Sequence, residues 1–264
     1  MNFGREQALL RQRLQAAGSP AVAAERQSLL PGATFLGASD DDVRQAATDL
    51  ANTYPQMGRA QMTAFVRTLW QSKIHELRTV GVELLAQRAA LLEPADLPFV
   101  EKLLADDVLD PVARRLATDV LGAMVDKSKK LWKDLRRLAA DADARLKRAA
   151  LRGSGLPARA DADAFPRFLE LAEPMLATAD AELLVVLDEV LGEIAEAHHD
   201  AVVAFAAQHG RKPKLPKKAK KPATSVLQPK AAAKKSAVTK PATKPATKKV
   251  AKKTASKAST RRAR

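Results

Sequence analysis

The chain has 264 residues, of which 46% are hydrophobic, enough for one or two domains with a substantial core. It contains no cysteine, which excludes disulfide bonds and thiolate chemistry. No apolar run approaches the ~20 residues that span a bilayer, and Arg5, Glu6 and Arg11 stand where a signal peptide would be apolar. We therefore expect a soluble, cytoplasmic protein without a membrane partner.

The formal net charge of +15 is divided very unevenly along the chain. Residues 211–264 contain 20 Lys or Arg and no Asp or Glu. Subtracting these from the totals leaves 25 basic and 30 acidic residues in residues 1–210, a net charge of −5. The sequence therefore predicts a folded domain over residues 1–209 and a basic tail over residues 210–264.

Within residues 1–209 the apolar side chains recur with the period of amphipathic α-helices, and no stretch alternates as a strand does. Ser39 precedes three aspartates, which supply a cap and negative charge where a helix begins. We predict a helix over residues 40–52. Acidic helix starts recur at Glu93 to Asp96 and at Asp180 to Glu182.

Two later segments, residues 116–125 and 183–194, each carry a continuous apolar stripe along one helix face. Between the helices we expect short breakers, at Gly37 to Asp40, Tyr54-Pro55, Gly153 to Pro157 and Glu173-Pro174. Helices joined by brief turns, with similar pairs roughly 35 to 45 residues apart, indicate an all-α superhelical solenoid of HEAT-like antiparallel helix pairs.

The four histidines offer no metal site by spacing. His75 lacks a second histidine four residues on, so we interpret it as an ordinary helix residue. The adjacent His198 and His199 point to different helix faces. We expect no metal and no small-molecule cofactor.

Residues 127–152 concentrate ten basic residues against three acidic ones. On successive helices of a solenoid such charges can merge into one stripe, although a solvated face is the plainer interpretation. The candidate DNA-binding residues are Lys127, Lys129, Lys130, Lys133, Arg145, Lys147, Arg148 and Arg152. Of the two tryptophans, Trp70 fits core packing, and Trp132 is either a buried anchor or a residue that stacks on DNA.

The tail is built from Lys, Pro, Ala, Thr and Ser and has too little apolar surface to offset chain entropy, so we expect it to be disordered when free. Regularly spaced lysines suit a polyanion, which they would bind by counterion release without reading sequence. A solubilising tail or a surface anchor is the alternative. The candidate tail contacts are Lys217, Lys218, Lys220, Lys221, Lys248, Lys249, Lys252, Lys253, Arg261, Arg262 and Arg264.

The order and spacing of several short motifs over about residues 34–209 resemble the DNA alkylation repair family. The motifs are Phe35-Leu36-Gly37, Leu69-Trp70-Gln71, His75-Glu76-Leu77-Arg78, Leu97-Pro98-Phe99-Val100-Glu101, Leu146-Lys147-Arg148-Ala149-Ala150 and Ala201-Val202-Val203-Ala204-Phe205. The resemblance implies a helical superhelix that cradles duplex DNA, including damaged or branched DNA, on a concave basic face. It also implies glycosylase activity on N3- and N7-alkylpurines.

The resemblance further implies a site made of a Trp, an Asp four residues later, an Arg and a second Trp. Here Asp110 stands at the first Trp position, Arg114 at the aspartate and Glu189 near the last Trp, whereas Arg148 matches the family arginine. Because the expected carboxylate is replaced by a cation, we expect no excision by the family mechanism. Asp110, or Asp119 in a shifted register, is the possible substitute.

Three hypotheses follow. The first is a monomeric, nucleoid-associated protein that holds DNA with residues 127–152 and with the tail. The second is a working alkylpurine glycosylase with a rearranged site. The third is a helical scaffold that binds proteins and touches DNA only through its tail.

Overall fold

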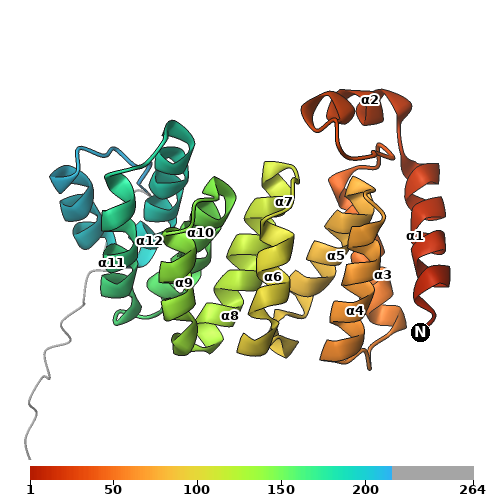
Figure 1. Ribbon diagram of the computed structural model, residues 1–264, viewed down its shortest axis with the longest axis horizontal. Helices are drawn as coiled ribbons and strands as arrows, with labels where there is room; N and C mark the ends of the chain where they lie inside the picture. Colours follow the sequence, from red (N-terminus) through yellow and green to blue (C-terminus); the bar gives the residue numbers. More distant parts are fainter. Residues whose placement is uncertain (216–264) are drawn as a thin grey trace, which may run out of the picture. The chain divides into compact units, whose positions relative to one another are not determined.

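The computed structural model describes residues 1–215, and these fold into an all-α helical repeat, as the sequence predicts (Figure 1). The helices of this part follow one another in chain order, from α1 at one end to α11 and α12 at the other. Their bounds are α1 Phe3–Ala17, α2 Pro20–Leu29, α3 Asp40–Thr53, α4 Arg59–Gln71, α5 His75–Gln87, α6 Leu97–Leu104, α7 Asp110–Arg115, α8 Gly122–Lys127, α9 Trp132–Ala139, α10 Ala144–Ala160, α11 Ala164–Leu176 and α12 Ala181–Gln208.

The predicted helix over residues 40–52 is α3, and its start is fixed locally. The Ser39 side chain accepts a hydrogen bond from the Asp42 backbone N–H, and the Asp42 carboxylate accepts one from the Ser39 N–H in return. This capping box satisfies two donors that a helix terminus would leave free. The acidic start at Asp180 is likewise the N-cap of α12, whereas Glu93 to Asp96 forms a short 3₁₀ turn, Pro94–Asp96.

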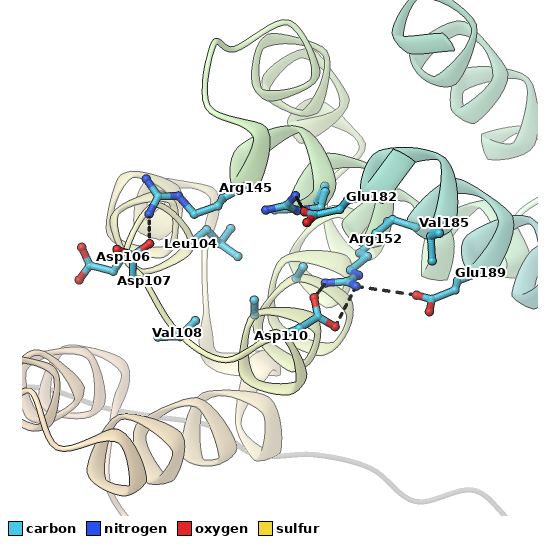
Figure 2. A pocket seen from close by; sticks show the side chains of 15 residues that line it. Leu104, Asp106, Asp107, Val108, Asp110, Arg145, Arg152, Glu182, Val185 and Glu189 are labelled. Atoms are coloured by element: carbon cyan, nitrogen blue, oxygen red, sulfur yellow. Dashed lines mark hydrogen bonds and ion pairs between the residues drawn. The ribbon is translucent and has the colours of Figure 1, made fainter. Parts of the chain in front are cut away.

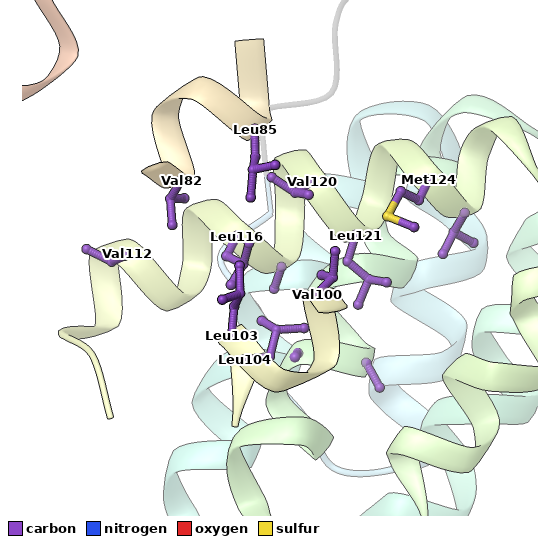
Figure 3. Packing of buried hydrophobic residues seen from close by; sticks show 14 of the residues in the cluster. Val82, Leu85, Val100, Leu103, Leu104, Val112, Leu116, Val120, Leu121 and Met124 are labelled. Atoms are coloured by element: carbon purple, nitrogen blue, oxygen red, sulfur yellow. The ribbon is translucent and has the colours of Figure 1, made fainter. Parts of the chain in front are cut away.

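The apolar stripe over residues 116–125 lies in a composite helix. A π-helical stretch, η3 (Leu116–Leu121), joins α7 to α8 without a break in helical backbone. Its buried side chains meet those of α5 and α6 in the core (Figure 3). The stripe over residues 183–194 forms the buried face of α12, which bends at His198, where the backbone leaves helical geometry.

Two predicted breakers are wrong. Gly153 to Pro157 lies inside α10, and Glu173-Pro174 lies inside α11. At Gly153 a Cβ would lie 2.8 Å from Leu121 Cδ2, so the glycine serves close packing of α10 against the η3–α8 helix instead of a turn. Pro174 stands two residues before the end of α11, where Ala172 and Met175 are buried and tertiary packing outweighs helix propensity.

The folded part extends beyond the predicted boundary at residue 209. Arg211 pairs with Asp188 of α12 and donates to the Leu184 carbonyl, and Leu215 packs against the core. These residues belong to a compact unit that begins at Met1 and is divided from the rest of the chain after Ala219. The predicted tail contacts from Lys217 to Arg264 lie outside the described residues.

Side-chain bonds repeatedly join residues about one repeat apart. Trp70 donates to the Asp106 carboxylate, 36 positions on, and Arg88 donates to the Ala51 carbonyl, 37 positions back. Arg137 pairs with Glu101 at a separation of 36 and Arg159 with Glu196 at 37. These separations agree with the roughly 35 to 45 residues expected between similar helix pairs.

Candidate functional site

The strongest candidate site is a groove between the α6–α7 connection, α7, and the first turns of α10 and α12 (Figure 2). We call this cavity, of about 440 Å³, the α10 groove. It is lined by three arginines and five carboxylates, with apolar side chains between them: Arg145, Arg148, Arg152, Asp106, Asp107, Asp110, Glu182, Glu189, Leu104, Val108, Ala113, Ala117, Ala149, Val185 and Val186.

The three arginines reach the groove because α10 places them on one face. Arg145, Arg148 and Arg152 follow one another at intervals of three and four residues, the spacing that keeps side chains on one side of a helix. Asp143 caps α10 by accepting from the Arg145 N–H. Its hydrogen bond from the Arg145 side chain also lowers the pKa of Asp143, so the cap stays ionised.

At the floor of the groove, Arg152 is buried, and both of its terminal nitrogens face carboxylates. It forms a bidentate salt bridge with Asp110, and its guanidinium lies 3.7 Å from the Glu189 carboxylate (Figure 2). A buried guanidinium held in this way positions the surrounding helices and is not free to bind a phosphate. Arg152, although predicted as a DNA contact, is therefore a structural ion-pair partner.

Arg114, the residue expected at the aspartate position, also faces carboxylates. Its guanidinium lies 3.4 Å from Glu189 and 3.1 Å from Glu193. Glu189, near the position of the last family tryptophan, therefore lies between two arginines. Arg114 and Glu189, which the sequence resemblance is expected to place at the carboxylate and the last aromatic position, form an ion-pair network in which Arg114 is neutralised.

Arg145 and Arg148 stand at the rim of the groove, and each has one partner that is much more exposed, although Arg145 is also paired with Asp143, the N-cap of its own helix. Arg145 pairs with Asp107, and Arg148 with Glu182, each of these carboxylates being 77% exposed. Surface ion pairs of this kind contribute only ~0 to 1 kcal/mol each. A phosphate can therefore replace either carboxylate at small cost.

The other predicted cations lie apart from the groove. Lys127 donates to the carbonyls of Ala90 and Leu92, and Lys129 pairs with Asp161. Lys147 is on α10 but does not line the groove. Lys130 and Lys133 are exposed and, among residues 1–215, have no salt-bridge partner. Of the eight cations predicted in residues 127–152, three line the α10 groove and five do not.

Both tryptophans are buried. Trp70 is 6% exposed and donates to Asp106, as core packing predicts. Trp132 is 3% exposed, which fits the buried anchor of the two alternatives and leaves no face for a base to stack on.

The sequence reasoning missed Asp107 and Glu193 and did not assign Glu182 a partner. The signal that would have found the pairs is the repeat spacing. Arg145 to Asp107, Arg148 to Glu182 and Arg152 to Asp110 span 38, 34 and 42 positions. Each pair therefore joins one helix pair to the next.

Within residues 1–215 no group of three or more His, Asp or Glu side chains is placed to hold a metal ion. Over the same residues no helix is both long and apolar enough to cross a membrane.

The sequence matches the family described as DNA alkylation repair enzyme over residues 10–227, more than half of the chain. Together with the helical-repeat fold, this match shows that the chain belongs to the DNA alkylation repair family. DNA is accordingly its substrate or partner. The match is longer than the motif resemblance over about residues 34–209. A comparison with curated proteins finds no match.

Proposed function

We propose that this protein binds duplex DNA, intact, damaged or branched, along the α10 groove and does not excise bases by the family mechanism. The observation that carries the proposal is the pairing of Arg114 with Glu189 and Glu193. Excision needs negative charge beside the cationic sugar of the transition state. A free carboxylate about 4 Å from the sugar would stabilise it by about 4 kcal/mol at an effective dielectric near 20, and Arg114, with Glu189 and Glu193 engaged in pairing with it, does not supply one.

Binding is supported by the rim of the groove. Arg145 and Arg148 come from neighbouring turns of α10, and both guanidiniums can exchange an exposed carboxylate for a phosphate. Contacts of this kind hold the DNA backbone without reading sequence. The lysine-rich tail would add nonspecific phosphate contacts, and the protein would act as a monomer associated with the nucleoid.

The test compares Arg145→Gln/Arg148→Gln with Arg13→Gln/Arg159→Gln in the full-length chain. The control removes the same charge from two ion-paired arginines that lie outside the α10 groove, since Arg13 pairs with Asp49 and Arg159 with Glu196. We expect the rim variant to bind a short duplex about tenfold more weakly than the control. Equal affinities would overturn the proposal and favour the protein-binding scaffold.

A second function, alkylpurine excision from a rearranged site, is favoured by one observation. Although both oxygens of Asp110 accept from Arg152, its side chain is 66% exposed in the groove, so a positively charged alkylated base could approach this carboxylate. The measurement is release of 7-methylguanine from alkylated DNA. Release that disappears in Asp110→Asn would establish this function, and no release from the unchanged protein would reject it.

A further inference from the structure

A second cavity, of about 590 Å³, opens between α4, α5 and α6. Its lining combines four basic side chains, Arg67, Lys73, Arg78 and Lys102, with two aromatic ones, Trp70 and Phe99. We call it the aromatic–basic pocket. Asp106 is its sole acidic lining residue among the described part of the chain, and its carboxylate accepts a hydrogen bond from the Trp70 indole.

The charge of this pocket is uncompensated, in contrast to the α10 groove. Among residues 1–215, no carboxylate forms a salt bridge with any of the four cations, whereas every arginine that lines the α10 groove has at least one carboxylate partner. The four cations and one carboxylate give the pocket a formal charge of +3. A concentration of this sign in a folded part that is otherwise not basic favours an anionic ligand.

Two guanidiniums in the pocket are already oriented. Arg67 lies over the Phe99 ring, with its guanidinium carbon 4.9 Å from the ring centroid, and Arg78 lies over Trp70 at 5.1 Å. Arg78 also donates from Nε to the Trp70 carbonyl at 3.1 Å. A planar guanidinium held on an aromatic face keeps N–H donors free at its edges. Those donors can form hydrogen bonds with two oxygens of a phosphate.

A third cation of the pocket, Lys73, lies in the turn between α4 and α5 and has a strained backbone. Lys73 has φ +57°, a left-handed conformation that glycine adopts more easily. Its carbonyl is fixed by the Thr34 N–H at 3.0 Å. The strained turn places a lysine, and therefore a positive charge, in the lining of the pocket.

The pocket adjoins the α10 groove. Asp106 lines both cavities, and Arg78 donates to the Asp107 carbonyl while the Asp107 carboxylate pairs with Arg145. We infer that the aromatic–basic pocket binds a backbone phosphate of nucleic acid that leaves the α10 groove over the α6–α7 connection. This inference rests on the proposed function, because it extends the same DNA path.

The test uses Arg67→Gln/Lys102→Gln in the full-length chain. Arg78 is left in place because its side chain donates to the backbone carbonyls of Trp70 and Asp107 and so links α4 to the α6–α7 connection. The control is again Arg13→Gln/Arg159→Gln, and a melting curve verifies that each variant folds. Relative to the control, we expect duplex affinity to fall about tenfold and the slope of log K against log salt to fall by about two, close to 0.9 for each phosphate that the variant no longer neutralises. An affinity and a slope equal to those of the control would overturn the inference.

Inorganic phosphate, at matched ionic strength, separates a free phosphate from a nucleic-acid phosphate. The readout is the Nε resonances of Arg67 and Arg78 by NMR. Shifts with the duplex support the inference, whereas shifts with inorganic phosphate alone reject DNA as the ligand. The rim variant Arg145→Gln/Arg148→Gln distinguishes the two proposals. If only the rim variant is weakened, the pocket inference fails. If only the pocket variant is weakened, the groove proposal fails.

Discussion

Arg152 donates two hydrogen bonds to Asp110, at 2.8 and 3.2 Å, and reaches this carboxylate from a side chain only 7% exposed, whereas Asp110 is 66% exposed. Arg152 thus depends on Asp110 and Glu189 to compensate a buried charge, and its Nε has no partner among residues 1–215. The floor of the groove is therefore held by an ion pair that links α7 to α10.

Asp110→Asn should lower the free energy of unfolding by about 1 kcal/mol. Hydrogen bonds to charged groups contribute about 1.5 to 3 kcal/mol, and the exposure of Asp110 reduces that figure. Urea denaturation measures the change. The control, Glu170→Gln, removes a 63% exposed partner of the half-exposed Arg136 and should leave stability nearly unaltered. If the two variants are equally stable, the pair at the groove floor contributes nothing.

Gly153→Ala should destabilise the protein by about 1 to 2 kcal/mol, since an added Cβ meets Leu121 in a packed interface and overpacking exceeds the gain in helix propensity. Gly4→Ala, in the first turn of α1 with its nearest neighbour 3.8 Å away, is the matched control and should be neutral or slightly stabilising. Thermal and urea unfolding both report the difference. A stabilised Gly153→Ala variant would show that α10 and the η3–α8 helix can separate freely.

The stability of the folded part should fall in mild acid because of His75. Burial lowers the pKa of His75 to about 4, against the partly opposing attraction of Glu76. Between pH ~6.5 and ~4 the unfolded chain binds a proton that the folded chain does not, so unfolding becomes easier as the pH falls, by up to about 3 kcal/mol. Denaturation curves at several pH values measure this slope. His75→Gln should flatten it, and an unchanged slope in that variant would assign the acid sensitivity to other groups.

Lys73→Gly should raise the free energy of unfolding by about 0.5 to 1 kcal/mol, since glycine relieves the left-handed backbone at this turn. The same variant should bind DNA more weakly, because one cation leaves the aromatic–basic pocket. Denaturation and duplex titration on one preparation give both quantities. Stability gained without any loss of DNA affinity would remove Lys73 from the binding surface.

The sequence predicts features that depend on residues close together in the chain, and it misses those that depend on residues far apart in it. The cap at Ser39 and the stripe over residues 183–194 depend on neighbours within a few turns, and both were predicted correctly. Gly153 and Pro174 looked like breaks because their helical role depends on packing against other helices. Asp107, a partner of Arg145, and Glu182, the partner of Arg148, lie about one repeat away, so a count of charge along the chain found the two cations but not these two carboxylates.

The most direct test of the account is a salt titration of duplex binding by a chain that ends at Ala219, the limit of the compact unit. This removes 15 of the 20 tail cations, so that the remaining chain has no formal net charge. We predict weakened but measurable affinity, and a further loss of about tenfold, with a salt slope shallower by about two, on Arg145→Gln/Arg148→Gln. No binding by the chain that ends at Ala219, or binding that the two substitutions leave unchanged, would contradict DNA binding by the α10 groove.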